Sequence, residues 1–555
     1  MEFDYVIVGG GSSGCALAAR LAEVREATVC LIEAGGKGRD LFIRMPAGNG
    51  LVFGNTKLDW GFESVPQPTL NGRKIYFPRG KALGGSSIMN GMIYVRGVPQ
   101  DYDAWRESGL SGWGFSDLLP YFRRSQGAVN RKAPWHGVDG PVKTEASVNF
   151  GELERGFIEA AVACGHRRLD DFNGPERTGV GRTDSTVYRG IRQSSAISYL
   201  AKPPPNLKIL THRHVTRLIL EGNRARGVET VGGEQIHARE EVVLCQGAFG
   251  TPQTLMLSGI GPFAHLKQHG INAVVDLPGV GESLADHVDV SMQYGSDRMD
   301  LSLARHQRLD KAALLMARWL LNGSGPGGGA FFSAVIFHAL KDPAMPEFET
   351  FMTPMTVHEN MTDGEVEKTP LLQRLGRHLL VRGSQVAKPG VQIDINLERP
   401  KSLGRVSLAS ANPADHPRID PRFFSHSDDL KEMVLGVKSM REIMAHREIA
   451  KYVTGEIGAW KEAKTDAEII EAIRKTAYTG HHPCSSVRMG PDGDPLAVLD
   501  SELRVRGVDN LRVCDASAMP SQITGNLNAT VIAMAERGAD LILGRSPLPP
   551  EDPRL

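Results

Sequence analysis

The stretch FDYVIVGGGSSG, residues 3–14, decides the fold of the N-terminal part of the chain. Its first half, Phe3 to Val8, is an apolar run typical of a parallel strand that is covered on both faces. Its second half fits the pattern G-x-G-x-x-G, with Gly9, Gly11 and Gly14 in the key positions. Such glycines allow a tight turn, close approach of backbone to a pyrophosphate, and contact between helix and strand. We therefore predict a strand, a phosphate-binding turn that includes Ser12 and Ser13, and a helix.

The next residues complete a dinucleotide-binding unit. Residues 15–22 are mostly small and aliphatic, and they favour a helix whose N-terminal amides face negative charge. A second strand is expected over Thr28 to Ile32, followed by Glu33 and Ala34, about 20 residues beyond the glycines. A carboxylate there can accept hydrogen bonds from the hydroxyls of an adenosine ribose. The acid favours FAD or NAD over NADP, although a glycine turn on its own can also arise for backbone reasons.

The composition suits a globular protein of two or more domains. The chain has 555 residues, of which 41% are hydrophobic, and 64 basic residues balance 64 acidic ones. This balance argues against a nucleic-acid partner or an anionic membrane patch. The six cysteines include no C-x-x-C pair, so we expect reduced thiols in a cytoplasmic protein and no metal site. We expect neither a signal peptide nor a membrane span, because a strand begins at residue 3 and no run of about 18 apolar residues occurs.

Two longer motifs carry a family resemblance. Residues 80–103 include GGSS at Gly84 to Ser87, and residues 247–261 read GAFGTPQTLMLSGIG. Both resemble signatures of the glucose-methanol-choline (GMC) oxidoreductases, and the resemblance covers nearly the whole chain. It implies an FAD enzyme whose cofactor-binding residues, besides those named above, are Arg79, Gly84, Gly85, Ser86, Asn90, Gly91, Val95, Val215, Asp515, Ala516, Asn526 and Asn528. For Val215, a core valine is as good an interpretation as contact with adenine.

The resemblance implies an α/β fold in which a Rossmann-like FAD-binding domain is interleaved with a substrate domain that contains an antiparallel sheet. The expected FAD-binding parts are residues 1–150, 191–287 and 476–555, and the substrate parts are residues 151–190 and 288–475. Residues 207–210, 215–220 and 241–245 are expected to form a small sheet with hairpin turns. Residues 397–400, 404–408 and 417–421 resemble the family's sheet facing the flavin. We predict an extended loop from Glu33 to Leu70, and a helix from Asp429 to Ala445 whose charges, Arg441 included, are a solvated face.

The chemistry is expected in the last quarter of the chain. Residues 480–490, GHHPCSSVRMG, resemble the family's catalytic segment, with Ser485 and Ser486 replacing the usual Gly and Thr. His482 takes the position of the catalytic base, a role that suits imidazole because it titrates near neutral pH. His481 is expected to shape the pocket. Asn526 takes the position of the second catalytic residue and would hydrogen-bond the alcohol oxygen, although an N-cap asparagine is the alternative.

Other motifs are interpreted without a catalytic role. Asp286 and His287 belong to a family-like segment, GVGESLADH, and we interpret them as a turn whose polar groups are satisfied. Met89 stands before Asn90, where members with a covalently linked flavin carry His, so we predict non-covalent FAD.

The implied reaction is oxidation of a primary or secondary alcohol to an aldehyde or ketone. His482 would take the hydroxyl proton as hydride passes to flavin N5, and oxygen or a quinone would be the electron acceptor. Choline dehydrogenase and a flavin-fold lyase of the hydroxynitrile lyase type remain alternatives. Choline-acting members carry an acid where residues 324–332, SGPGGGAFF, have none, which argues against choline. The sequence gives neither the particular alcohol nor the oligomeric state.

Overall fold

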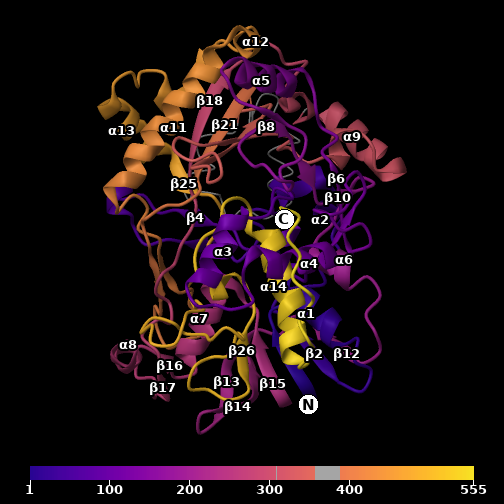
Figure 1. The fold of residues 1–555 in the computed structure, drawn as a ribbon, viewed down its shortest axis with the longest axis vertical. Helices are drawn as coiled ribbons and strands as arrows, with labels where there is room; N and C mark the ends of the chain where they lie inside the picture. The colour runs from indigo at the N-terminus through magenta and orange to yellow at the C-terminus, as the bar shows by residue number, and fades with distance from the viewer. Residues whose placement is uncertain (308, 357–387, 555) are drawn as a thin grey trace.

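The computed structural model describes residues 1–307, 309–356 and 388–554. Its strands form two large sheets, one in each half of the view in Figure 1. In the lower half, β1 (Glu2–Val8) lies between β2 (Val29–Ile32) and β15 (Gln235–Leu244), and it runs parallel to both. β12 (Leu207–Leu210) pairs with β2, and β26 (Leu511–Val513) pairs with β15, again in parallel. The predicted buried parallel strand and the α/β fold class are confirmed.

Two helices far apart in the chain pack together beside this sheet. They are α1 (Ser12–Leu21) and α14 (Leu527–Ile542), which lie next to each other in Figure 1. Ala16 and Ala18 of α1 are fully buried, and their small side chains permit close approach of a neighbouring helix. The last long helix of the chain is therefore built onto the first.

The strands expected to form a small separate sheet belong to this same sheet. β13 (Val215–Glu221) and β14 (Arg224–Thr230) form an antiparallel meander with β15, giving seven strands in all. The strand β14 was not predicted, because its alternating RARGVET sequence contains three charges and a glycine. The expected hairpin turns are present at Gly222 and at Gly232 and Gly233, which have positive φ.

The upper sheet has eight strands, and all its neighbouring pairs except β7 with β8 are antiparallel. Its order is β24 (Gly455–Glu456), β18 (Val288–Gly295), β21 (Gly390–Leu397), β20 (Phe348–Thr353), β19 (Ala334–His338), β8 (Gly179–Arg182) and β7 (Arg168–Leu169), with β25 (Ala477–Thr479) also paired to β18. The helices α5 (Glu152–Ala163), α11 (Ser427–Ala445) and α13 (Asp466–Thr476) pack against β8, β21 and β18 respectively. The predicted antiparallel sheet is confirmed, and its strands alternate along the chain with those of the lower sheet.

Three expectations differ from the structure. β22 (Arg405–Ser407) and β23 (Arg418–Asp420) pair with each other in a separate antiparallel ladder instead of joining the eight-stranded sheet. The expected loop between Glu33 and Leu70 contains α2 (Leu41–Arg44) and the 3-10 helix η1 (Pro46–Leu51). Arg441 is not simply solvated, since its guanidinium donates to Glu456 at 2.7 and 3.0 Å.

The remaining helices include α3 (Pro99–Glu107), α4 (Phe115–Ser125), α6 (Ser195–Tyr199), α7 (Gly247–Leu257), α8 (Phe263–Gln268), α9 (Leu309–Asn322) and α12 (Arg447–Ala450). Among the described residues, none of the helices combines the length and the apolar character that crossing a bilayer requires. All six cysteines are free thiols.

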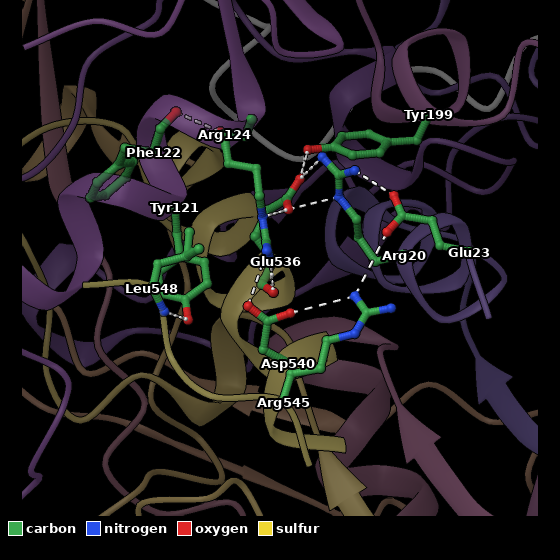
Figure 2. Close-up of polar contacts among 11 residues, drawn as sticks. Arg20, Glu23, Tyr121, Phe122, Arg124, Tyr199, Glu536, Asp540, Arg545 and Leu548 are labelled. Atoms are coloured by element: carbon green, nitrogen blue, oxygen red, sulfur yellow. Dashed lines mark hydrogen bonds and ion pairs between the residues drawn. The ribbon is translucent and has the colours of Figure 1, made fainter. Parts of the chain in front are cut away.

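A buried carboxylate fixes α14 to three other helices, as Figure 2 shows. Glu536 of α14 is 0% exposed, and it accepts hydrogen bonds from Arg20 of α1 at 2.8 and 3.0 Å. It also accepts from Arg124 of α4 at 2.6 Å and from the hydroxyl of Tyr199 of α6 at 2.6 Å. Charge-assisted bonds of this kind are strong where water is excluded. They hold the helix at whose N-terminus Asn526 stands.

Candidate active site

A cavity of about 660 Å³ is lined by residues of both sheets. Its size and largely apolar lining with a few polar groups are typical of ligand sites. Val8, Ile32 and Val215 line it from the seven-stranded sheet, and Asp289 and Asp394 line it from the eight-stranded sheet. The cavity therefore reaches from the nucleotide-binding motif to the strands of the expected substrate domain.

A larger open depression, of about 1270 Å³, lies over α1 and α4. Arg20, Arg124 and Tyr199 in its lining are the residues that bind Glu536. Because these groups hold α14 in place, the smaller cavity is the better candidate for the active site.

The N-terminus of α1 is built to accept an anion. Its N-cap residue is Gly11, which makes no side-chain cap, and its first turn contains no acidic residue. The free backbone amides and the helix dipole therefore point toward negative charge. Gly11, Ser12 and Ser13 line the cavity, and Asn528 donates to the hydroxyl of Ser12 at 2.9 Å.

The glycines of this motif have separate roles. A Cβ on Gly11 would lie 3.7 Å from the carbonyl oxygen of Cys245, an ordinary contact, and would extend into the space along the cavity wall. A Cβ on Gly14 would lie 1.9 Å from the carbonyl oxygen of Gly9, which no packing permits. Gly14 therefore serves contact between helix and strand, whereas Gly11 leaves room for a ligand. The residues present fit the diphosphate of a dinucleotide.

Glu33 stands at the end of β2, where a ribose would lie. Its carboxylate is buried and accepts from the amides of Gly10 at 2.9 Å and Gly35 at 2.8 Å. These bonds hold the side chain at the cavity, and burial raises its pKa. Each oxygen retains a second lone pair that can accept from a ribose hydroxyl.

Most of the predicted site residues meet at this one cavity. The lining includes Gly9, Gly11, Ser12, Ser13, Glu33, Ala34, Arg79, Gly85, Ser86, Asn90, Gly91, Val215, His482, Asp515, Ala516, Asn526 and Asn528. Gly14, Gly84 and Val95 are not part of it. Val95 packs in a hydrophobic cluster with Phe172 and Phe337, so its side chain has a core role. Asp515 lines the cavity, but its carboxylate accepts from Gly247, Thr251 and Ser517.

The two predicted catalytic side chains are in direct contact. Nδ2 of Asn526 lies 3.1 Å from Nε2 of His482, and both residues line the cavity. The backbone of Asn526 has the extended conformation of an N-cap residue, but its side chain makes no capping bond. Its Oδ1 is buried without a partner among the described residues. The capping interpretation therefore fails for the side chain, which is directed at His482 instead.

A third residue, His287, determines which nitrogen of His482 carries its proton. Nε2 of His287 lies 3.0 Å from the carbonyl oxygen of Ile523, which can only accept, so this nitrogen must carry a proton. Burial lowers the pKa of His287 to about 3, so the ring is neutral. Its Nδ1 therefore carries no proton and can only accept a hydrogen bond. This Nδ1 lies 2.9 Å from Nδ1 of His482, which must therefore donate. Nε2 of His482 is left unprotonated and accepts from the amide of Asn526.

The surroundings keep His482 neutral. Burial lowers its pKa well below the usual value, and His287, His481 and Arg79 add to the effect. Asp286 accepts from the backbone amide of His482 at 2.8 Å and from the hydroxyl of Thr479. The polar groups of Asp286 and His287 are satisfied, as expected, but the two residues do not form the predicted turn: they lie between an isolated bridge at Ala285 and the first residue of β18, and both contact His482. Sequence reasoning missed this role of His287.

A left-handed backbone conformation at Ser485 accounts for the glycine of the family pattern, and this chain departs from the pattern by carrying Ser there. Ser485, which replaces the usual Gly, has φ 66, and His481 has φ 65. Non-glycine residues adopt this left-handed region only at a cost. Backbone bonds from Ser485 to Ala516 and from Cys484 to Ala285 hold the loop in place.

Buried acids on the eight-stranded sheet were also missed. Asp289 and Asp394 line the cavity and are each 3% exposed. They come from β18 and β21, not from residues 324–332, where an acid was sought. The sequence did indicate that these acids share a face with other polar residues. In GVQIDINL, polar and apolar residues alternate, which places Gln392, Asp394 and Asn396 on one face of a strand. Which face meets the cavity depends on long-range pairing, and this is not visible in the sequence.

Comparison with known proteins agrees with the geometry. Residues 3–289 and 400–535 each match a family model described as GMC oxidoreductase. An oxygen-dependent choline dehydrogenase of Vibrio vulnificus (strain YJ016) is 37% identical over 560 residues, which cover 99% of this chain and 96% of the relative. One from Brucella suis biovar 1 (strain 1330) is 38% identical over 554 residues, covering 99% and 97%.

Solved structures show the same fold. Pyridoxine 4-oxidase from Mesorbium loti has a TM-score of 0.83 at 30% identity and covers 98% of this chain and 100% of its own. A formate oxidase has a TM-score of 0.86 at 28% identity, with 98% of each chain covered. The chain belongs to the GMC oxidoreductase family, and it is an FAD flavoprotein oxidoreductase that acts on CH–OH groups.

Proposed function

We propose that this protein oxidises a primary or secondary alcohol to the aldehyde or ketone, with His482 as the base and Asn526 as the group that orients the oxygen. The observation that carries the proposal is the contact of 3.1 Å between Nε2 of His482 and Nδ2 of Asn526 in the cavity wall. One group accepts a proton and the other donates a hydrogen bond. An alcohol hydroxyl placed between them has a partner for both its hydrogen and its oxygen.

The proton transfer follows from the tautomer of His482. The alcohol hydroxyl donates to Nε2 of His482, while its oxygen accepts from Nδ2 of Asn526. As the proton moves to Nε2, Nδ1 of the resulting imidazolium keeps its bond to the lone pair of His287. Asn526 steadies the negative charge that develops on the oxygen. His287 is fully buried and His482 and Asn526 are only partly exposed, which limits competition from water.

FAD, when bound, supplies the acceptor for the hydrogen that leaves the alcohol carbon as hydride. The residues that would hold its diphosphate are Gly11, Ser12 and Ser13, and Glu33 would hold the ribose. The N-terminus of α14, whose N-cap residue is Asn526 and whose first turn has no acid, favours negative charge on the ring system.

The FAD is bound without a covalent link in this proposal. Met89, beside Asn90, is buried in the cavity lining, and a thioether does not form the bond that a histidine forms in linked members. Protein precipitated with acid should release its yellow colour to the supernatant. Flavin retained in the pellet would contradict the proposal.

Oxygen is the proposed electron acceptor, with a quinone as the alternative. The names of the relatives, an oxygen-dependent dehydrogenase and two oxidases, support oxygen. Choline is a second candidate substrate, because the relatives are named for it and the cavity has carboxylates together with the aromatic residues Phe332, Phe351 and Tyr478.

The test is anaerobic reduction of the bound flavin by aliphatic, aromatic, sugar and amino alcohols, followed by admission of air or of a quinone. Bleaching by at least one alcohol and recovery with air are expected. Dithionite serves as the control for a reducible flavin. A flavin that dithionite bleaches and no alcohol does would overturn the proposal.

A further inference from the structure

Three ionisable side chains hold the backbone that leads into Asn526. The amide of Thr524 donates to Asp101 of α3 at 2.8 Å, and the hydroxyl of Thr524 accepts from Arg399 at 2.6 Å. The amide of the next residue donates to the carboxyl group of Glu398. Two of the three side chains directly follow β21 and the third lies on α3, so elements distant in the sequence meet at this segment. We call these three side chains the clamp.

Glu398 is the member of the clamp that contacts the supports of both proposed catalytic groups. Its Oε2 accepts from the amide of Gly525, the residue before Asn526. The same oxygen lies 3.8 Å from Nε2 of His287, whose other ring nitrogen lies 2.9 Å from His482. One carboxyl oxygen therefore stands between the partner of the proposed base and the residue that orients the alcohol.

The backbone of this segment needs such support. The carbonyl of Ile523 accepts from Nε2 of His287 at 3.0 Å, so residues 523, 524 and 525 each bond to a buried side chain. Gly525 has φ 93, which glycine adopts most readily. A Cβ on Gly525 would lie 2.9 Å from Val95 and 3.3 Å from Arg177. The segment is thus fixed in a tight and unusual path just before α14.

Glu398 acts in this arrangement as a hydrogen-bond acceptor. Its side chain is 0% exposed, and burial raises its pKa to about 8, so the carboxyl group is largely protonated at neutral pH. A protonated carboxyl group still has an oxygen that accepts from an amide. Oε1 is buried without a hydrogen-bond partner among the described residues, so Oε2 makes the contacts of this group. Without an acceptor here, the buried amide of Gly525 would be left unpaired, which is costly.

We propose that Glu398 is a positioning residue for the reaction. By holding Gly525 against His287, it sets the distance between the two groups that bind the alcohol. The inference rests on the proposed function, because one of these groups is Asn526, which orients the alcohol oxygen. Its contact of 3.1 Å with His482 joins two separate segments of the chain. A displacement of about 1 Å between reacting groups can slow a reaction by about 100-fold.

Two substitutions of Glu398 test the hydrogen bond. Glu398→Gln keeps an oxygen that accepts from Gly525, and it resembles the protonated acid. Glu398→Met keeps a similar volume and leaves only a weak acceptor. In anaerobic stopped-flow, the limiting rate of flavin reduction should be about 10- to 100-fold lower in Glu398→Met and close to the wild type in Glu398→Gln. The alcohol concentration that gives half of this rate should change little, since the loss concerns the reacting geometry.

Glu349→Met is the matched control. Glu349 of β20 is also a 0% exposed acid, but neither of its carboxyl oxygens has a hydrogen-bond partner among the described residues. Removing it deletes a buried acid without freeing an amide, so the reduction rate should stay close to the wild type. Bound flavin and melting temperature report whether each variant folds.

A second variant tests another part of the clamp and keeps the proposal open to refutation if Glu398→Met does not fold. Thr524→Val removes the hydroxyl that accepts from Arg399 and leaves the amide of Thr524 bound to Asp101. It should also lower the limiting rate with FAD bound. Either variant is sufficient for the test.

A double-mutant cycle distinguishes positioning from general damage. If Glu398 acts by placing Asn526, most of the effect of Glu398→Met should be lost in a protein that already carries Asn526→Ala. Two effects that simply multiply would show that Glu398 acts independently of Asn526, and this would overturn the proposal.

Hydrogen exchange separates this proposal from the proposed function, because it needs no turnover. The amide of Gly525 should exchange faster in Glu398→Met than in the wild type, and at the wild-type rate in Glu398→Gln and Glu349→Met. If no alcohol reduces the flavin but exchange changes in this way, the proposed function fails and the hold of Glu398 on the segment before Asn526 stands. A wild-type reduction rate in Glu398→Met, or a rate in Glu398→Gln as low as in Glu398→Met, would overturn the positioning role.

Discussion

Nδ1 of His287 lies 2.9 Å from Nδ1 of His482, and the carbonyl of Ile523 on the far side of His287 decides that His482 is the donor of this pair. Replacing His287 by Leu removes the acceptor, so His482 can carry its proton on the wrong nitrogen. We expect flavin reduction by alcohol to slow by about 10- to 100-fold, as is common when a residue that orients a reacting group is lost. Anaerobic stopped-flow measures this rate.

A conservative substitution of His287 distinguishes a role in positioning His482 from a role in holding the fold together. His287→Asn keeps an oxygen that can accept from Nδ1 of His482, and it should recover much of the rate lost in His287→Leu. The flavin content of the two variants should be the same. A rate for His287→Leu equal to that of the wild type would show that His482 needs no partner.

Removing the proposed base, His482, should slow flavin reduction more than removing His287 does. His482→Ala is expected to slow flavin reduction by about 100-fold or more with FAD still bound, since a positioned base contributes about 10² to 10⁴. Asn526→Ala should cost less, because water can replace part of its hydrogen bond. If His482→Ala reduces the flavin at the wild-type rate, then His481 or another group is the base.

The pH dependence of rate and of stability should differ. The base works when unprotonated, and burial lowers the pKa of His482 well below 6.5, so the rate of flavin reduction should stay level as pH falls through 6.5. The contribution that two buried histidines make to stability should already decline there, whereas buried acids with a raised pKa, among them Asp286 and Glu398, contribute in the opposite direction. Burial lowers the pKa of His287 and of His481 to about 3, so between pH 6.5 and 3 these two side chains bind more protons in the unfolded chain than in the folded one.

Two measurements check this pair of expectations. Stopped-flow mixing into acid buffer measures the rate before the protein unfolds, and thermal melting at each pH measures stability. A reduction rate that falls with a midpoint near 6.5 would show that His482 titrates as an exposed histidine.

Substitutions of Gly11 and of Gly14 should have different effects, the first on FAD binding and the second on folding. Gly11→Val should give a folded protein that lacks FAD, because a Cβ at this position makes only ordinary contacts with the protein and Gly11 lines the cavity. Gly14→Ala should destabilise the fold, because its methyl group would lie 1.9 Å from the carbonyl oxygen of Gly9. Flavin absorbance and circular dichroism separate the two results. A folded Gly11→Val protein that keeps its colour would contradict the assignment of the diphosphate site.

The bonds of Glu536 predict a large effect on stability. Glu536→Gln removes the fully buried counter-charge shared by Arg20 and Arg124, whose side chains are only 20% and 23% exposed. Arg124 then keeps Asp540, and Arg20 keeps only the half-exposed Glu23. We expect a loss of about 3 kcal/mol in the free energy of unfolding. Glu23→Gln is the matched control, because Glu23 also binds Arg20 but is 45% exposed, so it should cost less than about 1 kcal/mol. Urea denaturation measures both, and equal losses would contradict the role given to Glu536.

The sequence was sufficient to predict features whose residues lie close together along the chain. Gly9, Gly11 and Gly14 act within one turn of chain, so their spacing was sufficient to predict the strand, the turn and the helix. His482 and Asn526 were found through resemblance, because each lies in a motif whose context is local. Gly14 was assigned to the ligand as well as to the fold, and only the distance to Gly9 separates these roles.

Features that depend on pairing between distant strands escaped prediction. His287 was taken for part of a satisfied turn, because its partner lies 195 residues away. Asp289 of β18 and Asp394 of β21 meet at the cavity because their strands pair, and nothing in either strand alone shows which neighbour it will have. β14 was missed because its charges hid the alternation, and Val95 was assigned to the cofactor although its position in a buried cluster could not be seen.

The packing of α14 against α1 and α4 also bears on the order in which the protein becomes active during its synthesis. The glycine turn leaves the ribosome first, whereas His482, Asn526 and Glu536 come in the last part of the chain. At about 5–20 residues per second, the interval is on the order of tens of seconds. During that time α1 lacks its partner helix, and Arg20 and Arg124 lack their buried carboxylate. A nascent chain can thus contain the nucleotide-binding turn long before it can oxidise an alcohol, and it must keep an unfilled apolar groove from aggregating until the last helix closes it.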